Sequence, residues 1–144
     1  MSRTLFLAVV AAAAASPSLA AGPASPRAVV EAKFAAVNRH DLAGVVASYA
    51  PDAQVTAADF CKPRQGRAEV ERTYKGIFAA APDVTVELTD TVAQGDRVAV
   101  RFVLRTQQGG KTYELPIMNF FKVEHGLITR DDGLFDNHGR ACTP

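Results

Sequence analysis

The sequence has 144 residues, enough for one domain, and its 16 Lys and Arg side chains nearly balance 15 Asp and Glu, giving a formal net charge of +1. It contains no basic run and no interleaving of aromatic with basic residues. Such a chain lacks the positive surface that attracts nucleic acid or anionic lipid, so neither is expected as a partner.

The first twenty residues have the pattern of a secretory signal peptide. Arg3 supplies a positive charge, residues 4–15 are apolar or small, and Ser18 and Ala20 fit the small-x-small rule for cleavage after Ala20. The alternative is a transmembrane anchor, but the run is shorter than the ~20 apolar residues that cross a bilayer, and it consists largely of Ala. We therefore expect export to the bacterial periplasm or secretion, with a mature domain of residues 21–144 and no membrane association after cleavage.

Cys61 and Cys142 are the two cysteines of the chain. In an oxidising compartment an even pair predicts a disulfide. This bridge would close a loop of about 80 residues and contribute roughly 4–5 kcal/mol on the chain-entropy model. The sequence has no C-x-x-C motif, so a structural role is favoured over a redox role.

Three helices are predicted in the first part of the mature chain. Ser25-Pro26 is typical of a helix start, and that helix extends to about Arg39 with an apolar face of Val30, Phe34 and Val37. Asp41 can cap a second, short helix whose apolar positions are Leu42, Val45, Val46 and Tyr49. After a brief strand at 53–57, a third helix is expected at about 67–80, with one face formed by Val70, Tyr74, Ile77, Phe78 and Ala81.

The remainder alternates between apolar and polar residues in the manner of β-strands. Strands are expected at about 84–92, 98–104, 113–123 and 127–136, separated by turns at Gly95, at Gly109-Gly110 and at Gly126. Helices first and an antiparallel meander second indicate an α+β domain with the helices laid across one face of the sheet.

Several short motifs resemble one known family. They are, in chain order, His40-Asp41-Leu42 with Tyr49-Ala50-Pro51-Asp52-Ala53, Gly66-Arg67-Ala68-Glu69-Val70 with Tyr74, the segments 95–100 and 120–128, and Phe135-Asp136. Their order and spacing are similar to SnoaL-like proteins of the nuclear transport factor 2-like superfamily, which includes polyketide cyclases, ketosteroid isomerases and limonene epoxide hydrolases. The resemblance implies a cone-shaped roll, three N-terminal helices packed on a curved, mostly antiparallel sheet in the order α-α-β-α-β-β-β-β, around a cavity for a small hydrophobic ligand.

The candidate acid or base residues lie on the last predicted strand. Alternation places Asp131, Gly133 and Phe135 on one face, and the resemblance turns this face towards the cavity. It also places Asp136 where SnoaL-like cyclases keep an acid/base carboxylate, an arrangement that would require a local bulge. The alternatives are that Asp131 is a solvated strand residue and that Asp136 caps the C-terminal turn.

Residues expected to contact the ligand come from the third helix and the last two strands: Tyr74, Met118, Asn119, Phe120 and Phe135. For Tyr74 the alternative is a core ring whose hydroxyl bonds the backbone. The catalytic positions of ketosteroid isomerases align with Lys33, Ala57 and Met118, and only a supporting Tyr is matched, by Tyr74. The resemblance therefore does not extend to steroid isomerisation.

The three His residues are His40, His125 and His138, and no two of them have metal-ligand spacing, so neither a metal nor a cofactor is expected. Three function classes stay open. The first is an acid/base enzyme, an isomerase, cyclase or hydrolase in which Asp131 or Asp136 moves a proton. The second is a non-catalytic carrier or sensor of a hydrophobic ligand. The third is an interaction module that forms a homodimer through the outer sheet face, with Val103 and Phe121 exposed on it, as the resemblance implies.

Overall fold

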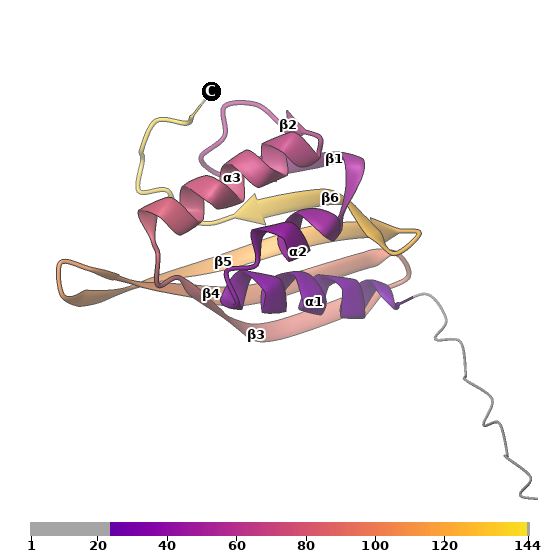
Figure 1. Ribbon diagram of the computed structural model, residues 1–144, viewed down its shortest axis with the longest axis horizontal. Helices are drawn as coiled ribbons and strands as arrows, with labels where there is room; N and C mark the ends of the chain where they lie inside the picture. Colours follow the sequence, from indigo (N-terminus) through magenta and orange to yellow (C-terminus); the bar gives the residue numbers. More distant parts are fainter. Residues whose placement is uncertain (1–23, 144) are drawn as a thin grey trace, which may run out of the picture.

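The computed structural model describes residues 24–143, where three helices lie across one face of a six-stranded sheet (Figure 1). The helices are α1 (Pro26–Asn38), α2 (Leu42–Ala47) and α3 (Arg67–Ala80). The strands are β1 (Tyr49–Ala57), β2 (Arg64–Gln65), β3 (Thr85–Gln94), β4 (Arg97–Gln108), β5 (Lys111–Glu124) and β6 (Leu127–Leu134). The predicted α+β roll is confirmed, whereas the proposed cleavage after Ala20 lies outside the described residues.

The strands are ordered β2-β1-β6-β5-β4-β3 across the sheet, with β1 and β6 parallel and all other neighbours antiparallel. Three details differ from the prediction. A short strand, β2, lies in the segment between β1 and α3, where no strand was expected. Tyr49 begins β1 instead of ending α2, because it pairs with Ile128 of β6. The last strand ends at Leu134, and the chain through Asp136 continues without regular structure.

Helix α1 packs its apolar face on the centre of the sheet. The Ser25 hydroxyl accepts a hydrogen bond from the Ala28 N–H and caps the helix. Phe34 is buried, with its ring centroid 4.7 Å from that of Phe102 on β4 and 5.9 Å from that of Phe121 on β5. These contacts fix the distance between α1 and the sheet.

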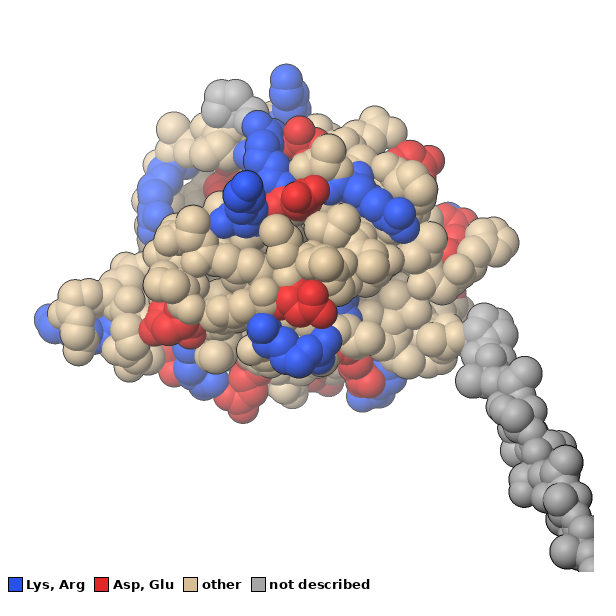
Figure 2. Space-filling view, viewed as in Figure 1, with Lys and Arg blue, Asp and Glu red and all other residues tan. Residues whose placement is uncertain are grey.

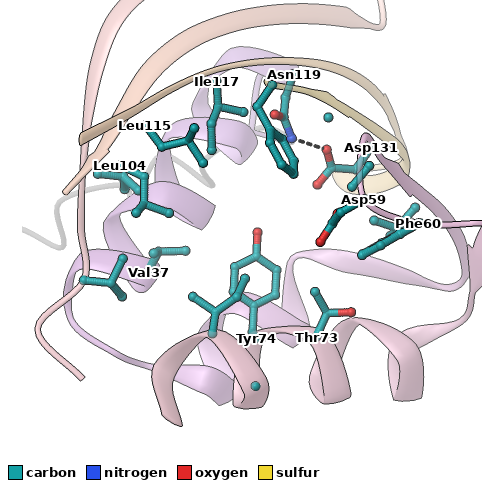
Figure 3. Close-up of a pocket in the computed structure, with 18 of the residues that line it drawn as sticks. Val37, Asp59, Phe60, Thr73, Tyr74, Leu104, Leu115, Ile117, Asn119 and Asp131 are labelled. Atoms are coloured by element: carbon teal, nitrogen blue, oxygen red, sulfur yellow. Dashed lines mark hydrogen bonds between the residues drawn. The ribbon is translucent and has the colours of Figure 1, made fainter. Parts of the chain in front are cut away.

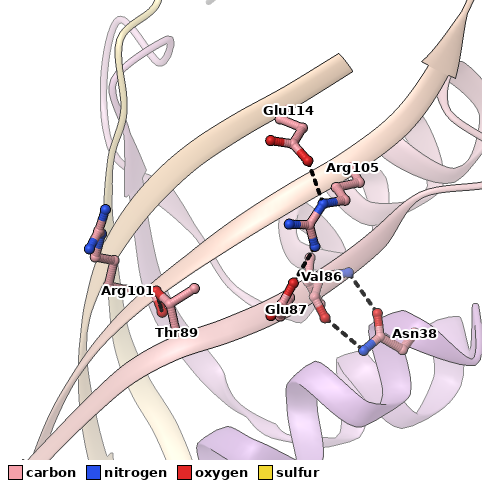
Figure 4. Close-up of polar contacts among 7 residues, drawn as sticks. All are labelled: Asn38, Val86, Glu87, Thr89, Arg101, Arg105 and Glu114. Carbon is pink, nitrogen blue, oxygen red and sulfur yellow. Dashed lines mark hydrogen bonds and ion pairs between the residues drawn. The ribbon is translucent and has the colours of Figure 1, made fainter. Parts of the chain in front are cut away.

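The end of α1 is tied to the edge of the sheet by Asn38 (Figure 4). Its amide nitrogen donates to the Val86 carbonyl at 2.9 Å, and its amide oxygen accepts from the Val86 N–H at 2.7 Å. Further along, both oxygens of Asp83 accept hydrogen bonds from β4, from the Thr106 hydroxyl and the Gln107 N–H. These bonds, that of Thr106 above all, lower the pKa of the Asp83 carboxyl.

A β-bulge in β6 decides which side chains of that strand face the helices. Lys122 of β5 pairs with Arg130, whereas the next residue, Val123, pairs with Ile128, so Thr129 is an extra residue in β6. Without it, Ile128 and Asp131 would point to opposite faces, since side chains alternate along a strand. With the bulge, both are buried on the inner face.

The outer face of the sheet mixes ion pairs with apolar side chains. Arg105 of β4 bonds Glu87 of β3 and Glu114 of β5 (Figure 4). The large apolar side chains exposed in the described residues are Val92, Met118, Phe120 and Leu134. The prediction that Phe121 belongs to this outer face is wrong, because its place in the strand alternation turns it inward against Phe34.

Charges of both signs are interspersed on the face of the molecule seen in Figure 2, in keeping with the near-neutral composition. On that face no extended region carries one sign alone. None of the helices in residues 24–143 has the length and apolar character needed to cross a membrane.

Candidate functional site

A cavity of about 700 Å³ lies between helices α1 and α3 and the inner face of the sheet (Figure 3). Its volume falls within the range of small-molecule binding sites. Most of its wall is aliphatic or aromatic, and the labelled apolar residues in Figure 3 are Val37, Phe60, Leu104, Leu115 and Ile117. A wall of this kind favours a ligand with a largely apolar body.

Strand alternation explains which residues of β5 reach the cavity. Leu115, Ile117 and Asn119 line it, while the residues between them point to the other face. Met118 and Phe120 are accordingly 42% and 47% exposed on the outer face. The prediction that they contact the ligand is wrong, because they alternate with the cavity-lining residues and so point to the opposite face of the sheet.

Asp131 is the buried carboxyl group of the cavity and is 3% exposed. One carboxylate oxygen accepts a hydrogen bond from the Tyr49 hydroxyl at 2.6 Å, and the other accepts from the Asn119 amide nitrogen at 2.5 Å. Figure 3 shows Tyr74 on α3 pointing across the cavity towards Asn119 and Asp131. The prediction that Asp131 faces the cavity is confirmed, and so is the placement of Tyr74, Asn119 and Phe135 in its wall.

Tyr49 is fully buried and holds the Asp131 carboxylate through its hydroxyl. Burial raises the pKa of Tyr49 well above its ordinary value of 10.0, and the negative charge of Asp131 raises this pKa further. The phenol therefore stays protonated and acts as a permanent hydrogen-bond donor to Asp131. Sequence reasoning placed Tyr49 only on the apolar face of the second helix and did not identify this role.

Asn119 needs close packing to reach Asp131. A Cβ atom on Gly133, directly across from Asn119 on β6, would lie 3.3 Å from the Asn119 amide oxygen. That oxygen is buried and has no hydrogen-bond partner among residues 24–143. Glycine at 133 thus leaves the room in which the amide lies beside the carboxylate.

Lys33 is a second buried charged residue in the cavity wall, with 2% of its surface exposed. Its Nζ atom lies 4.0 Å from the ring centroid of Phe34, 5.2 Å from that of Phe121 and 5.3 Å from that of Tyr74. No hydrogen bond or ion pair joins Nζ to another group in the described part of the chain. The sequence carried a signal for this placement, because Lys33 falls between Val30 and Val37 at helical spacing, on the apolar face of α1.

Asp136 does not line the cavity. It is exposed after the end of β6, where its carboxylate accepts a hydrogen bond from the His138 N–H at 2.7 Å. Asp136 therefore caps the C-terminal turn, which was the alternative considered in the sequence analysis. The bulge that a cavity position for Asp136 required occurs instead at Thr129, where it turns Asp131 inward.

The rim of the cavity is formed by the β1–β2 loop and the C-terminal segment, which the predicted disulfide joins. The Cys61 and Cys142 sulfur atoms are bonded, 1.96 Å apart. The Cys61 N–H donates to the Thr143 carbonyl, and an Nη atom of Arg64 donates to the Thr143 hydroxyl. The bridge therefore secures Thr143, a residue of the cavity wall, to the loop.

In residues 24–143 no three His, Cys, Asp or Glu side chains are grouped in the way that a metal site needs. The polar groups in the cavity wall include the buried Asp131 carboxylate, the buried Lys33 ammonium group, the Tyr74 phenol and the Asn119 carboxamide.

Comparison with known proteins places this geometry among related folds. Residues 30–131 match the sequence profile of a family described as the SnoaL-like domain. A candidate polyketide cyclase from Streptomyces antibioticus, IdmH, is 25% identical, with a TM-score of 0.71 over 80% of this chain and 94% of its own. A candidate polyketide cyclase from Xanthomonas campestris is 27% identical, with a TM-score of 0.64 over 78% and 91%. A protein with a ketosteroid isomerase-like fold from Catenulispora acidiphila is 20% identical, with a TM-score of 0.66 over 73% and 82%, and shares the fold.

Proposed function

The chain belongs to the SnoaL-like domain family, and from that premise we propose that it binds a small, largely apolar molecule in its cavity and uses Asp131 to move a proton on it. The observation that carries the proposal is the carboxyl group of Asp131, 3% exposed in an otherwise mostly apolar wall. Carboxylates held in shielded sites are typical of acid/base catalysis. The names of two structurally similar proteins, both candidate polyketide cyclases, support chemistry on a carbonyl compound.

The hydrogen bonds of Asp131 suit a proton acceptor. Tyr49 and Asn119 occupy one lone pair on each carboxylate oxygen, which leaves further lone pairs for a ligand. The two hydrogen bonds also fix the orientation of the carboxylate before the ligand enters, so no further ordering of this group is needed for proton transfer. In this mechanism Asp131 takes a proton from the carbon beside a ligand carbonyl and returns it to another position. Tyr74, whose hydroxyl points into the cavity, orients the carbonyl.

Deuterium exchange tests this proposal without knowledge of the natural substrate. We would follow the loss of the protons beside the carbonyl of 2-tetralone, a small apolar ketone, by NMR in D2O. The wild type should exchange them faster than buffer alone, and Asp131→Asn should lose about 10²–10⁴-fold of that acceleration. Asp136→Asn is the matched control and should exchange at the wild-type rate, because Asp136 lies outside the cavity. An unaccelerated wild type, or an Asp131→Asn variant as fast as the wild type, would contradict the proposal.

A carrier of a hydrophobic ligand is the second candidate, and one observation favours it. Both oxygens of Asp131 already accept hydrogen bonds from buried partners, as those of a purely structural carboxylate would. A carrier would bind apolar ligands equally well in the wild type and in Asp131→Asn, and neither protein would accelerate exchange.

We also propose that the protein is exported after cleavage behind Ala20. The disulfide supports this proposal, since such bonds persist in oxidising compartments. The intact mass of the exported protein should correspond to residues 21–144 with two hydrogens fewer than the reduced chain. A full-length mass, or two thiols free to alkylate, would contradict it.

We further propose a homodimer formed through the outer face of the sheet. Met118, Phe120 and Leu134 expose apolar surface there. Light scattering of the wild type should give twice the monomer mass, and Phe120→Lys should give the monomer mass. A monomeric wild type would contradict this proposal.

A further inference from the structure

Lys33 stands apart from the other cations in the cavity wall. Its side chain is more than nine-tenths buried on α1, within the stripe that includes Val30 and Phe34. Arg64, which also lines the cavity, donates through its two Nη atoms to the hydroxyls of Thr73 and Thr143. Lys33 has no such bond or ion pair within residues 24–143.

The surroundings of the Lys33 ammonium group satisfy its charge only in part. Three aromatic rings lie around Nζ, with Phe34 nearest at 4.0 Å, and the faces of aromatic rings attract cations. Rings supply no hydrogen-bond acceptor of ordinary strength, while an ammonium group has three protons to donate. A buried cation without an acceptor is costly, so an acceptor on the ligand would find a site already prepared for it.

Asp131 and Lys33 both lie next to Phe121. Asp131 pairs with Phe121 across β5 and β6 on the same face, and Nζ of Lys33 lies 5.2 Å from the centre of that ring. The two charges do not form an ion pair with each other. A ligand in the cavity therefore meets a proton acceptor at one point and a proton donor with positive charge at another.

We infer that Lys33 is the anion-binding residue of this cavity, and that the ligand is an apolar molecule carrying one anionic oxygen group, a carboxylate or an ionised phenol or enol. This inference rests on the proposed function in assuming that the cavity holds the ligand, but it requires no turnover. In the proposed reaction the same ammonium group stabilises the negative charge that develops on the carbonyl oxygen when Asp131 removes a proton.

Two probes of nearly the same shape test the inference: 2-naphthoate, which is anionic, and 2-naphthamide, which is neutral. Calorimetric titration of the wild type should show at least tenfold tighter binding of naphthoate, equivalent to 1.4 kcal/mol. Lys33→Met should reduce this ratio to about one, and Lys33→Gln should do the same if the methionine variant does not fold. Lys75→Met, which removes an exposed lysine from α3, is the matched control and should keep the wild-type ratio.

The Asp131→Asn variant separates this inference from the proposed catalysis. Removal of a neighbouring negative charge should leave naphthoate binding intact or tighten it, even though proton transfer is lost. A wild type without preference for naphthoate, whether it binds both probes equally or neither, would overturn the inference. So would a preference that persists in Lys33→Met or Lys33→Gln. If the wild type prefers naphthoate over naphthamide but does not accelerate ketone exchange, the result would contradict the role of Asp131 as a base and leave the role of Lys33 standing.

Discussion

Replacing Tyr49 with Phe removes the hydroxyl that bonds Asp131 and leaves the buried ring in place. The hydroxyl donates to the Asp131 carboxylate at 2.6 Å, and both residues are buried. Loss of a hydrogen bond to a charged acceptor costs about 1.5–3 kcal/mol, so we expect Tyr49→Phe to lower the free energy of unfolding by about 2 kcal/mol. For a domain of this size that corresponds to a fall in Tm of about 8 °C.

The loss of unfolding free energy on Tyr49→Phe depends on the negative charge of Asp131. A double-mutant cycle measures the contribution of that charge. In an Asp131→Asn background the tyrosine bonds a neutral amide, and the same substitution should cost only about 1 kcal/mol. The coupling between the two positions is then about 1 kcal/mol. The single Asp131→Asn variant should fold, because the Asn119 amide can turn over and its unpartnered oxygen can accept from the new side chain.

Urea unfolding at pH 7, followed by far-ultraviolet circular dichroism, measures all four proteins of the cycle. Tyr113→Phe is the matched control, since the Tyr113 hydroxyl forms no hydrogen bond within the described residues, and it should change stability by less than about 0.5 kcal/mol. Equal losses on Tyr49→Phe in the two backgrounds would refute the reasoning that the phenol supports a buried negative charge.

Three further predictions concern other parts of the fold. The pKa of Asp83 is lowered, by the Thr106 hydroxyl first, so the folded state binds protons less readily than the unfolded state. Stability should therefore fall as the pH drops through the ordinary aspartate value of 3.8 towards the lowered pKa, and Asp83→Asn should flatten this part of an unfolding curve measured against pH. Reduction of the disulfide should cost about 2–5 kcal/mol of stability in denaturant titrations, and an unchanged midpoint would contradict its structural role. Gly133→Ala should displace the Asn119 amide, which should slow ketone exchange clearly while lowering Tm only slightly. An unchanged exchange rate would show that the position of the amide is not needed.

Much of the fold could be predicted from the helical spacing and the strand alternation of apolar residues. The spacing of Val30, Phe34 and Val37 predicts the buried face of α1, and alternation with glycine turns predicts the hairpins of β3 to β6. The beginning of β1 could not be read in this way. Tyr49 continues the helical spacing of α2, and only its pairing with Ile128, distant in the sequence, determines that it is a strand residue.

The site was predictable only where alternation is uninterrupted. Asn119 and Met118 are neighbours, and the parity of Leu115 and Ile117 would have assigned Asn119 to the cavity and Met118 to the outer face. The bulge at Thr129 has no comparable signal in a single sequence, because it arises from the register between β5 and β6. That register turns Asp131 into the cavity, whereas Asp136 lies beyond the end of β6 in an exposed turn.

The most direct test of the cavity as the binding site is native mass spectrometry of the protein purified from its own host. Ile117→Trp fills the cavity from β5, while Met118→Trp adds the same volume on the outer face of the same strand. We predict a retained small molecule in the wild type and in Met118→Trp, and its loss in Ile117→Trp. Retention of the same molecule by a folded Ile117→Trp variant, or no retained molecule in the wild type, would contradict the account.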